Sequence, residues 1–269
     1  MQTIFRDIVK YHNGGLETVE DEIAVEEFLQ IFVNGEPYAV IMRLPGDDLD
    51  LVRGFCYTEG LFQELSEIEW LGHCPEEEGE NKILVELARP VGKLANHSHE
   101  TGTYISRSSC GLCGKTSVDK IYFPEKGVQN FSACSVQTLM RIKENFEQHI
   151  GLFPRTGYTH SAAIYSCDCE LLAFAEDVGR HNALDKIIGR VLLNEKQNQA
   201  FLGLVSSRLS FEMVQKAVII GLEIFAGISA PSSLAVQISS DYNLTLVGFL
   251  RESRMNIYTL QERVVLEDS

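Results

Sequence analysis

Several features that define whole classes of protein are missing from this chain of 269 residues. No stretch approaches the ~18 consecutive apolar residues that a membrane-spanning helix needs, and the first residues show no charged-then-apolar signal pattern. Basic residues are scarce. The chain has 23 lysines and arginines and 38 aspartates and glutamates, which gives a formal net charge of −15. Nucleic acids and anionic membranes would be repelled by that charge, so we expect neither as a main partner.

Repeats and low-complexity segments are also absent, apart from a short acidic run at residues 76–80. Seven cysteines is an odd number in a chain too long to be a disulfide-stapled mini-protein, which favours a reducing cytoplasm. The composition, 45% hydrophobic and 23% charged, is typical of a globular protein with one large domain or two unequal ones. We therefore expect a cytoplasmic protein whose thiols are either packed away or kept for chemistry.

Residues 1–130 predict a small β-rich part. Asn34-Gly35 stands between stretches of alternating apolar residues, which is a strong signal for a β-hairpin. After Pro45-Gly46, Asp47 or Asp48 is placed to cap a helix that runs to about Phe62. Residues 66–90 predict a second pair of strands, separated by the acidic run.

Residues 131–269 predict an α/β domain. After a helix from about residue 135 to residue 151, apolar patterns of strand type and helix type alternate. The predicted strands are 170–175, 201–206, 224–228 and 244–250, and the predicted helices are 182–193, 211–223 and 232–238. This order indicates a layered α/β fold with a mixed sheet that is largely parallel.

The stretch SSCGLCGK contains two thiols, Cys110 and Cys113, that are two residues apart and bracketed by glycines. It belongs to a segment from about residue 92 to residue 116 that is short of large aliphatic residues and rich in Ser, Thr, Gly and His. Loops this long are unusual in compact domains unless they are functional or disordered. We therefore predict a surface loop whose cysteines carry chemistry.

Three chemistries are open to the CxxC pair. Structural zinc needs four ligands, and His97 and His99 would have to complete the set at a spacing that fits no zinc finger. A thioredoxin-like pair needs an apolar strand before it and a helix after it, but both flanks are polar. A sulfur carrier needs an exposed thiolate that two partner proteins can reach, and Arg107 and Lys115 supply positive charge that favours thiolate. The sulfur carrier fits best.

The other five cysteines are better explained by packing than by chemistry, because unpaired cysteine often serves as a small buried or half-buried hydrophobic residue. These are Cys56, Cys74, Cys134, Cys167 and Cys169.

Polar clusters follow several of the predicted strands, and their repeated placement predicts one polar rim at an edge of the sheet. The clusters lie at residues 156–161, 176–182, 206–210 and 249–254. Helix capping by Asn182 and Ser210 would explain part of this pattern without a function. Arg251 and Arg254 suit phosphate binding, since each guanidinium can fork onto anionic oxygens, although a charged β-turn would explain them equally.

Taken together, these stretches resemble the formate dehydrogenase accessory sulfurtransferase family, FdhD. In chain order, the segments that carry the resemblance are SSCGLCGK, TGYTHSAA, EDVGRHNALDKIIG, SSRLSFEMVQKA, GISAPSSLAV and GFLRESR. The DVGRHNALDK stretch is the most specific of them. The resemblance implies a sulfur carrier that accepts sulfur as a persulfide from a cysteine desulfurase. It would pass this sulfur to the molybdenum or tungsten cofactor, a bis(molybdopterin guanine dinucleotide), before insertion into formate dehydrogenase.

The resemblance also implies roles for individual residues. Cys110 would hold the persulfide and Cys113 would assist. The guanine nucleotide end of the cofactor would contact Phe249, Leu250, Arg251, Glu252, Ser253 and Arg254. Glu252 and Ser253 stand where the family pattern leads us to expect smaller residues, often glycine.

A cytidine-deaminase-like C-terminal domain and a homodimer are further implications, without a permanently bound metal. The zinc chemistry of deaminases is not expected, because His160 stands in THSAA and the His-x-Glu pattern is missing. The alternative to the sulfur carrier is a non-catalytic, zinc-stabilised chaperone for the cofactor or the apoenzyme. Its zinc ligands would be His97, His99, Cys110 and Cys113.

Overall fold

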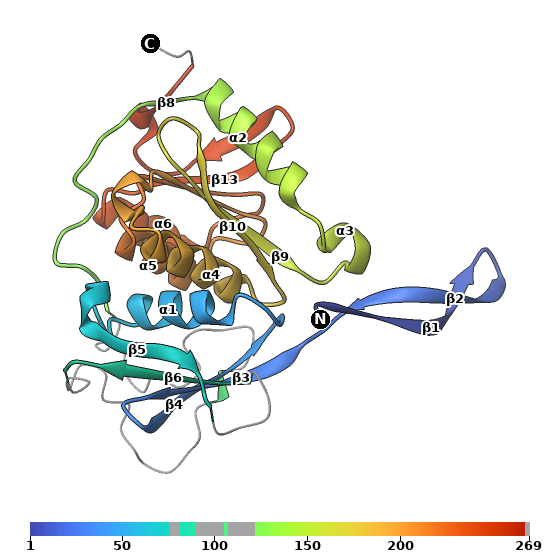
Figure 1. Ribbon diagram of the computed structural model, residues 1–269. Coiled ribbons are helices and arrows are strands. Elements are labelled where there is room, and N and C mark those ends of the chain that lie inside the picture. Colours follow the sequence, from blue (N-terminus) through green and yellow to red (C-terminus); the bar gives the residue numbers. More distant parts are fainter. Residues whose placement is uncertain (76–80, 90–104, 107–121, 267–269) are drawn as a thin grey trace.

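The computed structural model describes residues 1–75, 81–89, 105–106 and 122–266 (Figure 1). Two units are stacked on each other through helices, and a hairpin projects from the side of the molecule (Figure 1). We refer to the five-stranded sheet and the helix packed on it as the N-terminal unit. The six-stranded sheet and its helices form the C-terminal unit. Within the described ranges, no helix is both long and apolar enough to span a bilayer.

The sheet of the N-terminal unit has the strand order β5-β6-β3-β4-β7. The bounds are β5 (Ile68–His73), β6 (Lys82–Leu87), β3 (Glu27–Val33), β4 (Glu36–Arg43) and β7 (Ile105–Ser106). The predicted hairpin is confirmed, since β3 and β4 pair antiparallel across Asn34 and Gly35. Both turn residues have positive φ angles, 50° and 78°, as the favoured two-residue hairpin turn requires. The strand pair predicted around the acidic run is confirmed as β5 and β6.

Helix α1 (Asp48–Thr58) covers one face of this sheet. It begins where the sequence predicts and ends four residues earlier, because the chain turns at Gly60, whose φ is +76°. Asp47 occupies the N-cap position with a φ of 56°, and its side chain makes no capping hydrogen bond. The predicted start of the helix is therefore confirmed, but side-chain capping is not.

Strand β7 interrupts the segment 92–116 that the sequence predicts to be a loop. Ile105 and Ser106 pair in parallel with Val40 and Ile41 of β4. The rest of that segment, including Cys110 and Cys113, lies outside the described residues.

The sheet of the C-terminal unit has the strand order β10-β9-β11-β12-β13-β14. The bounds are β9 (His160–Tyr165), β10 (Leu171–Asp177), β11 (Leu202–Val205), β12 (Ile224–Gly227), β13 (Thr245–Arg251) and β14 (Arg254–Ile257). Only β11–β12 and β12–β13 are parallel pairs, and the other neighbours are antiparallel. The sheet is therefore mixed, and the expectation of a largely parallel sheet is wrong. Strand β9 was not predicted from the sequence, and it adds two of the antiparallel pairings.

Helices cover both faces of the six-stranded sheet (Figure 1). Helix α2 (Val136–His149) packs on one face through Leu139, Ile142 and Phe146. On the opposite face lie α4 (Arg180–Leu193), α5 (Phe211–Ile219) and α6 (Ser233–Asp241). Each fully buried Leu, Ile or Phe contributes roughly 1.5–3 kcal/mol to folding, so these two layers hold the unit together.

The two units meet where α1 crosses α4 (Figure 1). Gly54 of α1 and Gly189 of α4 lie at the crossing. A Cβ atom on Gly54 would overlap the carbonyl oxygen of Asp185, and one on Gly189 would overlap the carbonyl oxygen of Asp50. Only glycine at both positions allows the two helix backbones to approach this closely.

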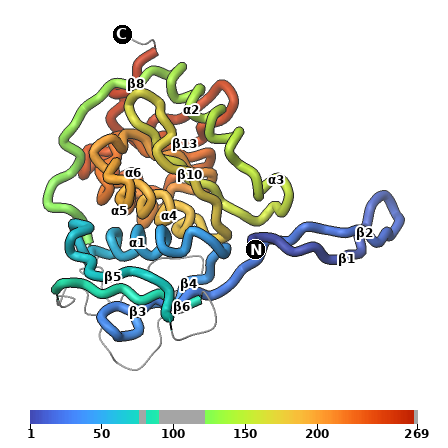
Figure 2. The backbone as a smooth tube through the Cα atoms, in the orientation of Figure 1, coloured from blue at the N-terminus to red at the C-terminus, as the bar shows by residue number. Residues whose placement is uncertain are grey.

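The projecting hairpin consists of β1 (Thr3–His12) and β2 (Gly15–Ala24) (Figures 1 and 2). Apolar side chains on it are exposed, including Phe5, Tyr11 and Leu16. Near its base Glu22 forms an ion pair with Arg155 of α3 (Phe153–Thr156).

Residues 122–133 link the two units along the outer side of α5 and α6 (Figure 2). The ring of Phe123 stacks on that of Tyr242, with 4.8 Å between the ring centres. The side chain of Gln215 donates to the carbonyl of Tyr122 over 2.7 Å. The chain then enters β8 (Cys134–Ser135), which pairs in parallel with β15 (Val264–Val265). Short 3₁₀ turns also lie in the described part of the chain, at Leu65–Glu67, Gln197–Gln199 and Gln261–Arg263.

Candidate functional site

The polar clusters predicted from the sequence gather at one edge of the six-stranded sheet. Strands β10, β11, β12 and β13 run in the same direction, so their carboxyl ends share this edge. Strand β9 runs the opposite way, so its first residue, His160, lies there too, opposite Asp177 at the end of β10. We refer to this site as the carboxyl edge, and it comprises residues 158–161, 177–181, 206–210, 228–232 and 249–254.

Hydrogen bonds tie the loops of the carboxyl edge to one another. The backbone N–H of Ser161 donates to the hydroxyl of Ser206 over 2.9 Å, and the N–H of Ser206 donates to the carbonyl of Ser161 over 3.0 Å. Leu209 N–H reaches the carbonyl of Ala230 over 3.1 Å. The predicted single polar rim is therefore confirmed.

Positive charge accumulates at this edge in an otherwise acidic protein. Burial lowers the pKa of His160, and the guanidinium groups of Arg180 and Arg208 lower it further, against the opposing effect of Asp177. Arg208 is exposed, and within the described ranges it forms no ion pair with a carboxylate. His160 is consequently neutral at pH 7, beside two permanent cations.

His181 is a second neutral histidine in the first turn of α4. Burial lowers its pKa to about 3, and Arg180, Lys216 and His160 act in the same direction. Its Nε2 atom is shielded from solvent and has no hydrogen-bond partner in the described part of the chain. An uncharged ring nitrogen without a partner is unusual among buried polar groups.

The hairpin of β13 and β14, which carries Arg251 and Arg254, lies at the end of the carboxyl edge opposite β9 and β10. The two arginines are cross-strand partners on either side of a two-residue turn, Glu252-Ser253, in which Glu252 has a φ of 38°. The charged β-turn that the sequence offered as an explanation is thus present. Both guanidinium groups are exposed, and neither pairs with a carboxylate among the residues described, so both can still meet an anion.

Other contacts of this hairpin restrict what it presents to a ligand. Arg251 Nε donates to the carbonyl of Ile228 over 2.9 Å, and its guanidinium lies 5.9 Å from the ring centre of Phe249. The side chain of Leu250 is fully buried in the core. Among residues 249–254, Leu250 can therefore face a ligand only through its backbone.

Glu176 fixes the loop that leads into β9. Its carboxylate accepts hydrogen bonds from the backbone N–H groups of Gly151 and Leu152, both over 2.9 Å. The hydroxyl of Thr159 donates to the same carboxylate over 3.1 Å. The approach to His160 is therefore anchored to β10.

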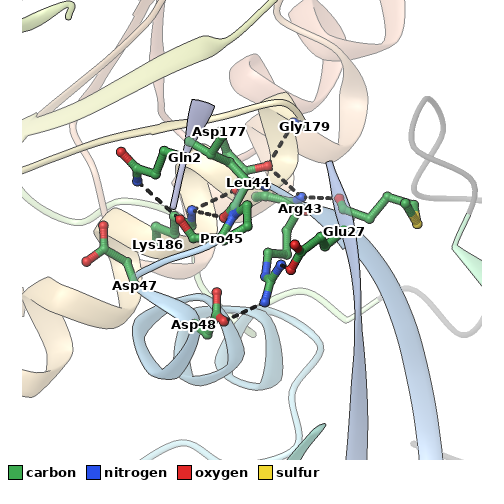
Figure 3. Close-up of polar contacts among 12 residues, drawn as sticks. Gln2, Glu27, Arg43, Leu44, Pro45, Asp47, Asp48, Asp177, Gly179 and Lys186 are labelled. Atoms are coloured by element: carbon green, nitrogen blue, oxygen red, sulfur yellow. Dashed lines mark hydrogen bonds and ion pairs between the residues drawn. The ribbon is translucent and has the colours of Figure 1, made fainter. Parts of the chain in front are cut away.

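The DVGRHNALDK stretch, residues 177–186, has a structural role beneath the edge. Asp177 and Lys186 form a fully buried ion pair at 2.8 Å. Asp177 also accepts from the N–H of Leu44 over 3.1 Å, and Lys186 donates to the carbonyl of Leu44 over 3.0 Å (Figure 3). This pair therefore attaches the β4–α1 connection to the C-terminal unit.

Asn182 does not cap α4, so that sequence-based explanation is wrong. The helix begins at Arg180 with Gly179 as its N-cap. The side-chain amide of Asn182 donates to the carbonyl of Met42 and to Asp177, both over 2.8 Å. A buried amide that reaches across to the N-terminal unit satisfies its own hydrogen bonds. Ser210, in contrast, does occupy the N-cap of α5, but its side chain makes no capping bond.

A second buried ion pair lies further along α4, within the C-terminal unit, and contacts the N-terminal unit through Thr58 of α1. Lys216 of α5 donates to both carboxylate oxygens of Asp185, over 2.8 and 2.9 Å, and to the hydroxyl of Thr58 over 2.7 Å. Burial raises the pKa of Asp185, and the attraction of Lys216 opposes that rise. Within the N-terminal unit, Arg43 at the end of β4 forms an ion pair with Asp48 of α1 at 2.8 Å (Figure 3). We refer to this region as the α1–α4 interface, comprising Arg43, Leu44, Asp48, Gly54, Thr58, Asp177, Asn182, Asp185, Lys186, Gly189 and Lys216.

The cysteines divide into three groups. Cys56, Cys74 and Cys134 are buried, as expected for packing residues. Cys167 is exposed, so the expectation of a packed residue is wrong there. Cys169 is partly exposed.

The proposed persulfide pair and the alternative zinc ligands, Cys110, Cys113, His97 and His99, lie outside the described residues. Among the residues that are described, no group of three or more His, Cys, Asp or Glu is placed to hold a metal ion.

The fold and the site define an α/β protein of two stacked units with exposed arginines along the carboxyl edge of its main sheet. The chain belongs to the FdhD/NarQ family, whose family model matches residues 24–265. The resemblance drawn from the sequence motifs is therefore confirmed.

Two relatives and one solved structure illustrate the similarity. The sulfur carrier protein FdhD of Streptomyces coelicolor is 38% identical, with 97% of this chain and 95% of the relative covered. The protein of the same name from Sulfolobus acidocaldarius is 39% identical, with 96% and 97% covered. The crystal structure of a protein assigned as a formate dehydrogenase accessory protein from Desulfotalea psychrophila has a TM-score of 0.77. At 24% identity over 98% of this chain and 100% of that one, it shows a shared fold.

Proposed function

We propose that this protein is a cytoplasmic sulfur carrier for the maturation of formate dehydrogenase. It accepts sulfur from a cysteine desulfurase on Cys110 and delivers it to the bis(molybdopterin guanine dinucleotide) cofactor before the cofactor enters the enzyme. The observation that carries this proposal is the family match over residues 24–265, which spans the CxxC pair. The names of the relatives, sulfur carrier protein FdhD, support the same function.

The loading step is a transfer between two thiols. The Cys110 thiolate attacks the outer sulfur of the desulfurase persulfide, and the desulfurase cysteine leaves as a thiolate. One sulfur–sulfur bond breaks and one forms, so no external oxidant is needed. The product is a persulfide on Cys110.

The second thiol supplies the electrons for release. Cys113 attacks the inner sulfur of the persulfide, a Cys110–Cys113 disulfide forms, and the outer sulfur departs as sulfide to the metal of the cofactor. A thiol reductant must then reduce the disulfide before the next cycle. Both cysteines are therefore needed for delivery, whereas Cys110 alone suffices for loading.

The carboxyl edge is our candidate for the cofactor site. Arg208, Arg251 and Arg254 are exposed cations without carboxylate partners in the described ranges, in a chain whose net charge is −15. Such groups bind the pyrophosphate oxygens of a guanine dinucleotide well, because guanidinium forks match anionic oxygens. We place the nucleotide end of the cofactor against the Arg251–Arg254 hairpin and include a homodimer and a cytidine-deaminase-like C-terminal unit in the proposal.

The test is the mass of the intact protein after incubation with a cysteine desulfurase and cysteine. We expect the wild-type protein and Cys113→Ala to gain a sulfur that a reductant removes, and Cys110→Ala to gain none. A full bound sulfur on Cys110→Ala would refute the assignment. Metal analysis of the same samples tests the zinc-stabilised chaperone, which requires stoichiometric zinc that is lost in His97→Ala and His99→Ala.

A further inference from the structure

The hairpin that joins β9 to β10 presents two thiols at the opposite end of the strands from the carboxyl edge. It lies on the side of the sheet away from the N-terminal unit (Figure 1). Cys167 is exposed and Cys169 is partly exposed, with one residue between them. Neither cysteine has a part in the proposed sulfur delivery, so this pair needs its own explanation.

The turn that carries the pair is well ordered by hydrogen bonds. The backbone N–H of Cys169 donates to the carbonyl of Ser166 over 3.0 Å, and the N–H of Ser166 donates to the carbonyl of Glu170 over 2.9 Å. Ser166 also accepts from the N–H of Glu170 on its hydroxyl, over 3.1 Å. Cys169 has a φ of 63°, a left-handed conformation that hairpins usually assign to glycine or asparagine. Cysteine has no conformational advantage at this position.

Arg141 of α2 holds the second sulfur. Its Nη2 atom donates to Sγ of Cys169 over 3.3 Å. The guanidinium therefore places a cation against the sulfur that would carry negative charge in a thiol exchange reaction. Buried Cys56 offers the contrast, because burial strongly raises the pKa of its thiol.

The spacing of the two cysteines is compatible with a disulfide. Residues two apart in a chain are at most about 7 Å apart between Cα atoms, and a turn shortens that distance. Disulfides form across about 4.4–6.8 Å between Cα atoms. The pair is not part of a metal-binding group of three or more ligands in the described ranges, which favours redox chemistry over metal binding.

We propose that Cys167 and Cys169 form a thiol–disulfide exchange pair whose substrates are low-molecular-weight disulfides of the glutathione class. The Cys169 thiolate attacks the disulfide, forms a mixed disulfide and releases one thiolate. The Cys167 thiolate then attacks Sγ of Cys169 and releases the second. The two protein thiols lose two electrons in total, and their two protons end on the two released thiols.

The experiment uses the full-length protein with Cys110→Ser and Cys113→Ser, so that the CxxC pair cannot consume the oxidant. The reduced protein is incubated with oxidised glutathione, alkylated and digested, and the peptide that spans both cysteines is weighed. We expect this peptide to lose two hydrogens through an internal disulfide, whereas Cys56 in the same digest stays a thiol. A peptide that remains a dithiol, or that stops at a glutathione adduct, would overturn the proposal.

Two variants on that background test the order of attack and the role of the cation. Cys167→Ser should stop at a glutathione adduct on Cys169, and a failure to form this adduct would contradict Cys169 as the attacking thiol. Arg141→Ala should slow the first step about threefold, because the guanidinium that contacts the attacking sulfur over 3.3 Å is lost. Gln148→Ala, an exposed neutral change on the same helix, is the control. An equal rate in Arg141→Ala and the control would remove Arg141 from the site.

Discussion

The α1–α4 interface and the carboxyl edge both contain residues of the stretch 177–186, but their charged side chains are arranged differently. At the interface, Asp177 meets Lys186 and Asp185 meets Lys216, each pair at 2.8 Å and buried. At the edge, Arg208 and Arg251 are exposed and have no carboxylate partner within the described part of the chain. Residues 177–186 contribute to both regions, because Asp177, Asp185 and Lys186 form the buried pairs while Arg180 and His181 lie at the edge beside His160.

The difference separates the charged side chains that stabilise the fold from those that are available to bind a ligand. Removing one partner of a buried pair leaves a charge without compensation, which costs about 3–5 kcal/mol. An exposed guanidinium without a partner costs little, because water solvates it. Substitutions at the interface should therefore affect stability first, whereas those at the edge should affect binding first.

The largest expected effect is that of Lys186→Met. The substitution leaves Asp177 buried without its cation and removes the hydrogen bond to the carbonyl of Leu44, so the free energy of unfolding should fall by about 3–5 kcal/mol. Urea denaturation measures this change. Lys196→Met, which removes a surface contact at 3.4 Å to Glu170, is the control and should cost under about 1 kcal/mol. Equal losses in the two variants would contradict the structural role of Lys186.

Gly54→Ala should give the next largest loss of stability. The added methyl group overlaps the backbone of α4 at Asp185, and separating two helices costs about 2–3 kcal/mol, even though alanine favours helix by about 1 kcal/mol over glycine. Gly15→Ala is the matched control, because its Cβ atom meets only the carbonyl of His12 at 3.6 Å. A stabilised Gly54→Ala protein would show that α1 and α4 are not closely packed in solution.

A smaller loss of stability is expected when the pH falls, because the pKa of His181 is lower in the folded protein than in the unfolded chain. Its pKa is about 3 in the folded protein against about 6.5 in an unfolded chain. Between these values the unfolded state binds a proton that the folded state does not, so stability falls as the pH drops from about 6.5 toward 3. At pH 5 this loss amounts to at most about 2 kcal/mol.

The free energy of unfolding, measured by urea denaturation at pH 7 and pH 5, should therefore fall more between these pH values in the wild-type protein than in His181→Gln. The two proteins share all other titrating groups, so the difference between their changes in the free energy of unfolding reports on His181. An identical change in the free energy of unfolding in both proteins would mean that the imidazole is hydrated in the folded protein.

The smallest effect on stability, and the clearest on binding, is expected at the edge. Arg251→Ala and Arg254→Ala should each weaken binding of guanosine diphosphate about tenfold and change the free energy of unfolding by less than about 0.5 kcal/mol. Calorimetric titration measures the affinity. Arg89→Ala, an exposed cation on the N-terminal unit, is the control. Unchanged affinity in both edge variants would remove this hairpin from the cofactor site.

The sequence predicted most elements of the fold, because their signals are local. The hairpin at Asn34-Gly35 and the helix after Ser135 depend on turn chemistry and helical periodicity, and both are confirmed. Strand β9 was missed, since small and polar residues in HSAAIY mask its alternation. The direction of the outer strands was also mispredicted, because strand direction depends on pairing between distant segments rather than on local pattern.

The site was predictable in part for the same reason. Polar clusters after apolar strands correctly indicated one shared edge. The buried roles of Asp177 and Asn182 were missed, since their partners at Leu44 and Met42 lie more than a hundred residues away. No local feature distinguishes an asparagine that caps a helix from one that reaches across an interface. The exposed position of Cys167 likewise depends on how its hairpin packs.

The most direct test of the central claim is the transfer of labelled sulfur. The protein is loaded by a cysteine desulfurase with radiolabelled cysteine, separated from small molecules and mixed with bis(molybdopterin guanine dinucleotide) cofactor. Our account predicts that label moves from the protein to the cofactor, that Cys113→Ala retains its label, and that Cys110→Ala is never labelled. Label that stays on the wild-type protein, or that reaches the cofactor from Cys110→Ala, would contradict it.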